Sequence, residues 1–127
     1  MNDKTISNAE LEVMRLLWRK QGAMTLAQIR DELLRTTKWN HSTIKTLVFR
    51  LRDKGVIEPL DKYGAAQFVP KVSESEYIRS EVPTFIARVF EGNAKALAAA
   101  LCQGGQLNEG DIDELKHFFQ MGDCRDE

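Results

Sequence analysis

The sequence predicts a mostly α-helical protein with a small β-wing, in which a winged helix-turn-helix domain over residues 1–71 precedes a helical domain over residues 73–127. Three observations predict this arrangement. Three segments with helical periodicity come first, two short strand-like segments around a turn follow, and a further set of helical segments completes the chain. Helix, helix, helix and hairpin, in that order, is typical of a winged helix.

Composition places the chain among soluble globular proteins. Hydrophobic residues make up 43% and charged residues 29% of the 127 residues, and no apolar run reaches membrane-spanning length. The first ten residues have no apolar core of the secretory type, so we expect a cytoplasmic location. The two cysteines, Cys102 and Cys124, form no zinc-type motif, so neither a metal site nor a cofactor is predicted. Cys102 is expected to be a buried, inert thiol.

The first two helices are predicted from their capping boxes, in which a hydroxyl side chain stands three residues before a carboxylate or an amide. Ser7 opens a helix over residues 8–21, with Gly22 as its stop. Thr25 opens a shorter helix that ends near Thr36. The apolar positions of the two helices are Leu11, Met14, Leu17 and Trp18, then Leu26, Ile29 and Leu33.

The third helix is predicted from one narrow apolar stripe between a cap and a glycine. Asn40 or Ser42 can cap its start, and Lys54-Gly55 is typical of a helix end. The stripe consists of Ile44, Leu47, Val48 and Leu51, at positions i, i+3, i+4 and i+7.

The period then changes from that of a helix to that of a strand. Residues 56–60 and 67–70 are strand-like, and residues 61–66 are predicted to form the turn between them. Pro59 and Pro70 are expected at edge positions, because proline lacks the N–H that a central strand needs.

The rest of the chain is predicted to form short helices. Ser73 begins a third capping box, and Pro83 should kink or restart the helix that follows. Residues 92–93 and 104–105 interrupt the pattern, and Asn108 can cap a last helix.

These C-terminal helices are too few to bury much apolar surface alone. We therefore expect a symmetric homodimer, and the alternative is that they fold back on the N-terminal half of a monomer. The residues expected at the dimer interface are Phe85, Ile86, Val89, Phe90, Leu97, Leu101, Ile112, Leu115 and Phe119.

The outward face of the third helix is polar and basic, which favours double-stranded DNA as the partner. Residues 1–70 hold 12 lysines and arginines against 8 acidic residues, whereas residues 71–127 hold 6 against 11. Hydroxyls, cations and one aromatic ring are suited to base edges and phosphates in a major groove. The predicted contacts are His41, Ser42, Thr43, Lys45, Thr46, Phe49 and Arg50, with Lys62 on the wing.

Other interpretations of the same residues remain open. The outward face is also compatible with a solvated amphipathic helix, or with a winged helix that binds protein. A metal- or ligand-sensing regulator would use the scattered soft ligands His41, Cys102, His117 and Cys124. An enzyme is not predicted, because the sequence has no glycine-rich phosphate loop, nucleophile elbow or metal triad.

Three stretches, SNAELEVMRLLW, STIKTLVFRLRDKGVI and QFVPKVSESEY, resemble the penicillinase-repressor family, BlaI/MecI/CopY. The resemblance covers nearly the whole chain, and residues 43–55 match the family's recognition-helix signature. It implies a winged-helix repressor with a helical dimerisation domain. Such a repressor occludes an inverted-repeat promoter operator, and the third helix would carry the base and phosphate contacts. It also implies a role in antibiotic resistance.

The chain departs from two branches of that family. In the β-lactam-responsive branch, a membrane-embedded sensor protease cuts an Asn-Phe bond, and the aligned bond here is Ala100-Leu101. In the copper branch, paired C-terminal CxC motifs bind metal, whereas the tail here has only Cys124. The inducing signal is therefore not predicted.

Overall fold

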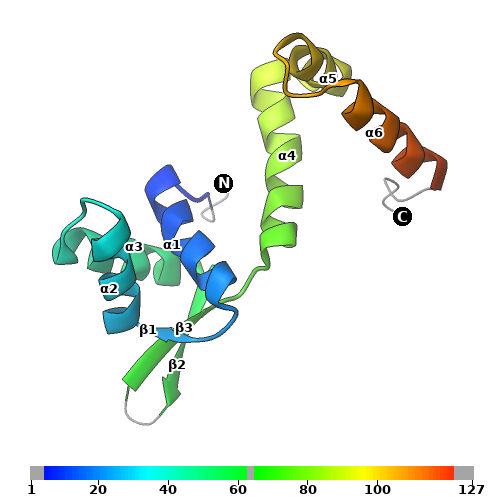
Figure 1. The fold of residues 1–127 in the computed structure, drawn as a ribbon. Coiled ribbons are helices and arrows are strands. Elements are labelled where there is room, and N and C mark those ends of the chain that lie inside the picture. Colours follow the sequence, from blue (N-terminus) through cyan, green and yellow to red (C-terminus); the bar gives the residue numbers. More distant parts are fainter. Residues whose placement is uncertain (1–4, 63–64, 122–127) are drawn as a thin grey trace. The chain divides into compact units, whose positions relative to one another are not determined.

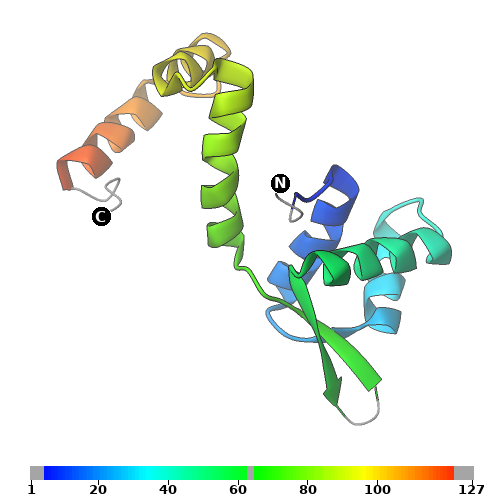
Figure 2. The ribbon, with the colours of Figure 1, turned by 180° about the vertical axis from the view of Figure 1, so that it is seen from behind.

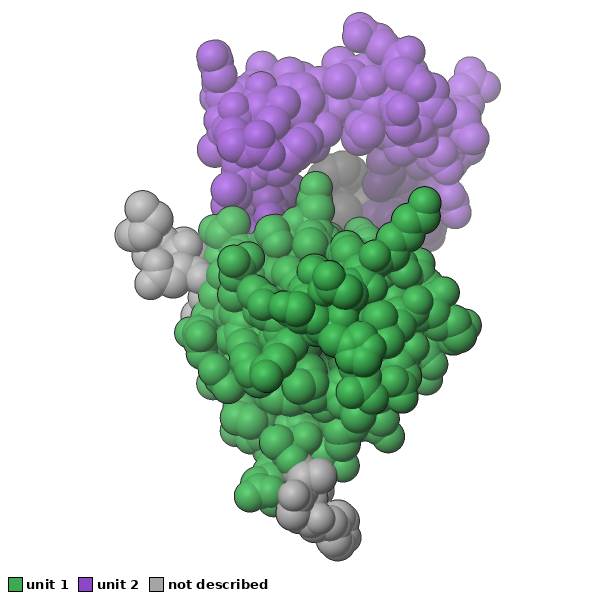
Figure 3. Space-filling view, turned by 90° about the vertical axis from the view of Figure 1, so that its left-hand side faces the viewer, with its two compact units in different colours: residues 1–78 green, residues 79–127 purple. Residues whose placement is uncertain are grey.

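A computed structural model describes residues 5–62 and 65–121, which belong to two compact units, Met1–Ile78 and Arg79–Glu127 (Figure 3). The predicted fold class, mostly helical with a small β-wing, is confirmed. The elements in chain order are α1 (Asn8–Lys20), β1 (Met24–Thr25), α2 (Leu26–Thr36), α3 (His41–Lys54), β2 (Ile57–Lys62), β3 (Ala65–Pro70), α4 (Glu74–Phe90), α5 (Ala94–Gln103) and α6 (Glu109–Met121) (Figure 1).

The helix starts follow the predicted caps. The Ser7 hydroxyl accepts a hydrogen bond from the Glu10 N–H at 3.1 Å, and the Glu10 carboxylate accepts one from the Ser7 N–H at 2.9 Å. Thr25 and Ser73 head capping boxes of the same kind. One predicted stop is displaced by a residue: α1 ends at Lys20, and its C-cap is Gln21, which adopts the left-handed conformation at φ 56° in place of Gly22.

The sheet has three antiparallel strands in the order β1-β3-β2. The hairpin is longer than predicted, reaching Lys62 and resuming at Ala65, and Figure 1 shows it extending away from the three helices. Pro59 lies on the edge strand β2 as expected. Pro70 does not: β1 makes β3 the central strand, and Pro70 is tolerated there as its last residue.

The hydrophobic core lies entirely in the first unit. It includes the predicted stripe of α3, so the orientation of that helix about its own axis is confirmed. The buried core residues are Ile6, Val13, Met14, Leu16, Leu17, Met24, Ile29, Leu33, Ile44, Leu47, Val48, Leu51, Val56, Ile57 and Phe68.

The second unit contrasts with the first, because none of its described residues is buried. Cys102, expected to be a buried thiol, is instead exposed on α5, since α5 has no buried side chain. Cys124 lies outside the described residues. Helix α4 runs through Pro83 as one continuous helix. Among the described residues, no helix has the length and apolarity to cross a membrane.

Candidate nucleic-acid interface

Helix α3 is held at both ends by features of its own sequence. Asn40 is the N-cap, and its side-chain oxygen accepts from the Thr43 N–H at 2.8 Å. Gly55 ends the helix at φ 79°, a left-handed conformation that glycine adopts without the steric cost of a Cβ. Because the stripe on one face of α3 is buried in the core, the opposite face is turned to solvent. Figure 2 shows the course of this helix from behind.

Replacing Asn40 with alanine is expected to lower the unfolding free energy by about 1 kcal/mol, because the first turn of α3 loses its side-chain acceptor. Urea denaturation followed by circular dichroism measures this loss. Asn40→Asp keeps an acceptor oxygen and serves as the matched control, with stability close to the parent. Equal stability of the alanine variant and the parent would show that this cap does not matter.

Most of the predicted contact residues on α3 are exposed. Five of them are exposed and therefore accessible to a partner: His41, Ser42, Lys45, Thr46 and Arg50. Thr43 is half-buried, and its N–H is the group capped by Asn40. Lys62 is the last residue of β2, and its side chain lies outside what the structure describes.

Phe49 differs from the fully outward position expected of it. It is half-buried, because its large ring is long enough to pack against the edge of the hydrophobic core. The Arg52 guanidinium carbon lies 4.5 Å from the ring centroid, and the Lys45 ammonium lies 5.7 Å from it. Both distances are within the range of cation–π attraction. The ring thus attracts two cations of α3, Lys45 and Arg52. Arg52 was not among the predicted contact residues, although it lies three residues from Phe49.

An ion pair between the buried Glu10 and the half-buried Lys54 joins the end of α3 to the start of α1. The Lys54 ammonium lies 2.5 Å from a Glu10 carboxylate oxygen and 2.7 Å from the Thr5 carbonyl oxygen, and Glu10 is only 2% exposed. Burial raises the pKa of Glu10, but the hydrogen bonds and charge of Lys54 and the bonds from Ser7 outweigh it, so the pKa is lowered overall. From the sequence, only local roles at helix ends were predicted for these two residues.

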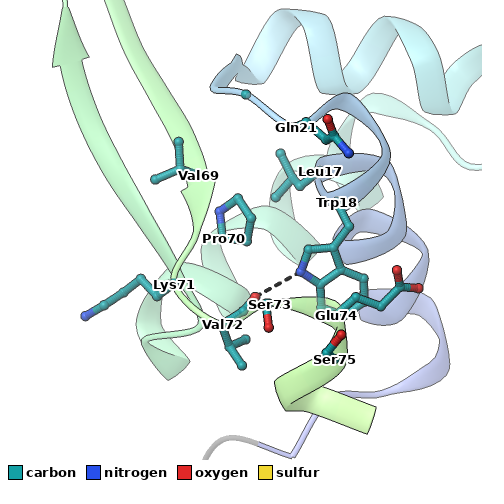
Figure 4. Close-up of a pocket in the computed structure, with 11 residues that line it drawn as sticks. Leu17, Trp18, Gln21, Val69, Pro70, Lys71, Val72, Ser73, Glu74 and Ser75 are labelled. Atoms are coloured by element: carbon teal, nitrogen blue, oxygen red, sulfur yellow. Dashed lines mark hydrogen bonds between the residues drawn. The ribbon is translucent and has the colours of Figure 1, made fainter.

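The junction between the wing and α4 is fixed on α1. The Trp18 indole N–H donates to the Val72 carbonyl at 2.9 Å (Figure 4). The Trp18 ring centroid also lies 5.8 Å from that of Tyr77. A hollow of about 510 Å³ lies beside this bond, between the end of α1, the end of β3 and the first turn of α4. Among the described residues, no group of three or more His, Cys, Asp or Glu is placed to hold a metal ion.

The predicted interface residues of the second unit lie on α4, α5 and α6. Phe85, Val89 and Leu115 are exposed, and Ile86, Phe90, Leu97, Leu101 and Ile112 are half-buried. The side chain of Phe119 lies outside the described residues. Three further exposed apolar side chains were not predicted: Ile78, Val82 and Phe118.

The three-helix core, the sheet that ends in a hairpin and the exposed basic face of α3 together define a winged helix-turn-helix protein of the DNA-binding class. Residues 6–121 match the penicillinase repressor family. The chain belongs to this family.

Two relatives match this chain over most of their length. The penicillinase repressor of Bacillus licheniformis is 31% identical over 115 residues, which cover 91% of this chain and 89% of that protein. The methicillin resistance regulatory protein MecI of Staphylococcus aureus (strain N315) is 32% identical over 121 residues, covering 94% and 98%.

Two solved structures share the fold of the first unit. One is the solution structure of the DNA-binding domain of the repressor BlaI, at TM-score 0.52 and 34% identity, covering 58% of this chain and 89% of that chain. The other is monomeric B. licheniformis BlaI in complex with the blaP half-operator, also at TM-score 0.52, with 33% identity, covering 57% and 88%.

Proposed function

We propose that the chain is a homodimeric transcriptional repressor that acts in the cytoplasm and occludes a palindromic promoter operator. Residues 1–71 would bind DNA, and residues 73–127 would dimerise. The observation that carries the proposal is the outward face of α3, where hydroxyl and basic side chains are exposed while the opposite stripe is buried. The likeness to BlaI bound to a half-operator supports it.

The mechanism follows from this arrangement. The N-terminal turns of α3 enter the major groove, so Ser42, Lys45 and Thr46 meet base edges or phosphates there. Two copies of α3, related by the two-fold axis of the dimer, would occupy successive major-groove faces. RNA polymerase is then excluded from the promoter by the bound protein.

Operator binding by the parent chain is the direct test. Fluorescence anisotropy is measured on the promoter upstream of the protein's own gene, at two salt concentrations, with unrelated DNA as competitor. We expect tight, competitor-resistant binding by two protomers, with a log–log salt slope of about −0.9 for each phosphate contacted. Weak binding, equal on both DNAs, would instead favour another target or a protein partner for α3.

Replacing Arg50 with alanine is expected to weaken operator binding by about 1–3 kcal/mol, because an exposed guanidinium on this face is suited to a guanine edge. Anisotropy on the operator and on unrelated DNA measures the loss. Arg15→Ala removes an exposed arginine of α1 and is the control. A similar loss on both DNAs would assign Arg50 to phosphate, and unchanged affinity would remove it from the interface.

A further inference from the structure

Helices α2 and α3 enclose a second hollow, of about 250 Å³, beside the outward face of α3. Its apolar part is formed by Leu26 of α2, which is half-buried, and Ile44 of α3, which is buried. The other three lining residues are all basic: Arg30, His41 and Lys45. Basic side chains from two different helices therefore converge on one small surface.

The charges around the hollow are poorly neutralised. Arg30 pairs with its neighbour Asp31, at 3.1 Å between guanidinium and carboxylate, but the Asp31 side chain is 69% exposed. Pairs of this exposure contribute little and exchange readily with other partners. Within the described part of the chain, neither Lys45 nor His41 forms a salt bridge. The first turn of α3 adds the positive end of its helix dipole.

We propose that this hollow anchors one sugar-phosphate unit of the DNA backbone, with Arg30 of α2 as a contact residue outside the recognition helix. The deoxyribose carbons would meet the half-buried Leu26, whose neighbour Ile44 forms the buried floor of the hollow, and the phosphate oxygens would accept hydrogen bonds from Arg30 and Lys45. This inference rests on the proposed function, because the hollow adjoins the face of α3 assigned to the major groove. It gives α2 a role in setting how α3 enters that groove.

If the hollow holds a phosphate, substitutions at two neighbouring residues of α2 should change DNA affinity in opposite directions. Arg30→Ala should weaken binding about tenfold, equally on operator and on unrelated DNA, because a phosphate carries no sequence information. Its salt slope should fall by about 0.9, the value of one phosphate contact. Asp31→Asn should tighten binding about two- to fivefold, because it removes a carboxylate that competes for Arg30 and repels phosphate.

The matched control is Arg35→Ala. Arg35 is also on α2 and also pairs within its helix, with Glu32 at 2.5 Å, but it does not line the hollow. Its affinity and salt slope should equal those of the parent. Because the effect of Asp31→Asn is a gain, misfolding does not explain it.

The experiment is fluorescence anisotropy with the full chain on the mapped operator and on an unrelated duplex of the same length, at several salt concentrations. An Arg30→Ala variant that binds like Arg35→Ala would overturn the inference, and so would a loss confined to the operator, which indicates a base contact. If the parent chain binds neither duplex, the proposed function itself fails and this inference with it. Binding by the parent with no effect of Arg30 leaves the proposed function standing.

Discussion

Replacing both Val82 and Val89 with aspartate is expected to convert the protein into monomers and to weaken binding to the full operator about 100-fold or more. Four apolar side chains of α4 are exposed at spacings of four, three and four residues: Ile78, Val82, Phe85 and Val89. This spacing is typical of a seam between paired helices. A carboxylate at two of its positions would be buried without a partner in a dimer.

The measurements are sedimentation velocity for the oligomeric state and anisotropy for DNA binding. The variant should bind a half-operator as the parent does, because its winged helix is unchanged, and should lose only the advantage of two linked half-sites. Thr84→Asp is the matched control, since Thr84 is exposed on the same helix and lies away from the seam. A variant that remains dimeric would refute the seam on α4 as the dimer contact.

Replacing Lys54 with methionine is expected to lower the unfolding free energy at pH 7 by roughly 3–5 kcal/mol, because it leaves the Glu10 carboxylate buried without its cation. Urea denaturation measures this loss. Lys20→Met is the control: Lys20 lies 3.9 Å from Glu32 in a largely exposed pair, so its loss should cost less than about 1 kcal/mol. A Lys54→Met variant as stable as the parent would show that the buried pair contributes nothing.

The pair of Lys54 and Glu10 should also make the unfolding free energy depend on pH. The pKa of Glu10 is lowered below its ordinary value of 4.5, so its contribution to stability is present above that pH and is lost as the pH falls through the folded-state pKa. Without Lys54, the pKa of Glu10 should rise, because burial then meets less opposition. The stability difference between the parent and Lys54→Met should therefore shrink as the pH falls from the folded-state pKa of Glu10 in the variant to its lower folded-state pKa in the parent. If the difference stayed constant into acid, the lower stability of Lys54→Met would not be due to the charge of Glu10.

The features that the sequence predicted well are those set by neighbours along the chain. The capping boxes at Ser7, Thr25 and Ser73 each join residues three apart, so the helix starts were found to within a residue. The stripe from Ile44 to Leu51 repeats at the helical period, so the buried side of α3 was found as well. The exposure of its outward residues follows from the same rotation, while their contacts with DNA stay predictions.

The features that were missed depend on residues far apart in the chain. Strand β1 has only two residues and exists because Met24 and Thr25 pair with Phe68 and Gln67. The ion pair of Lys54 and Glu10 joins residues 44 positions apart, which no local pattern indicates. Arg30 was overlooked because the hollow it lines requires two packed helices, although its place four residues after Leu26 was visible on α2.

The absence of buried residues among those described in the second unit has a consequence for gene regulation. If pairing with a second copy is what completes that unit, the amount of functional repressor depends on how much protein the cell holds. Where protomers are dilute, the dimer concentration rises with the square of their concentration, so halving the protein lowers the dimer concentration about fourfold, and an unsaturated operator loses occupancy in the same proportion. Dilution by cell growth would then relieve repression more than in proportion to the fall in protein concentration, and so would a small drop in synthesis.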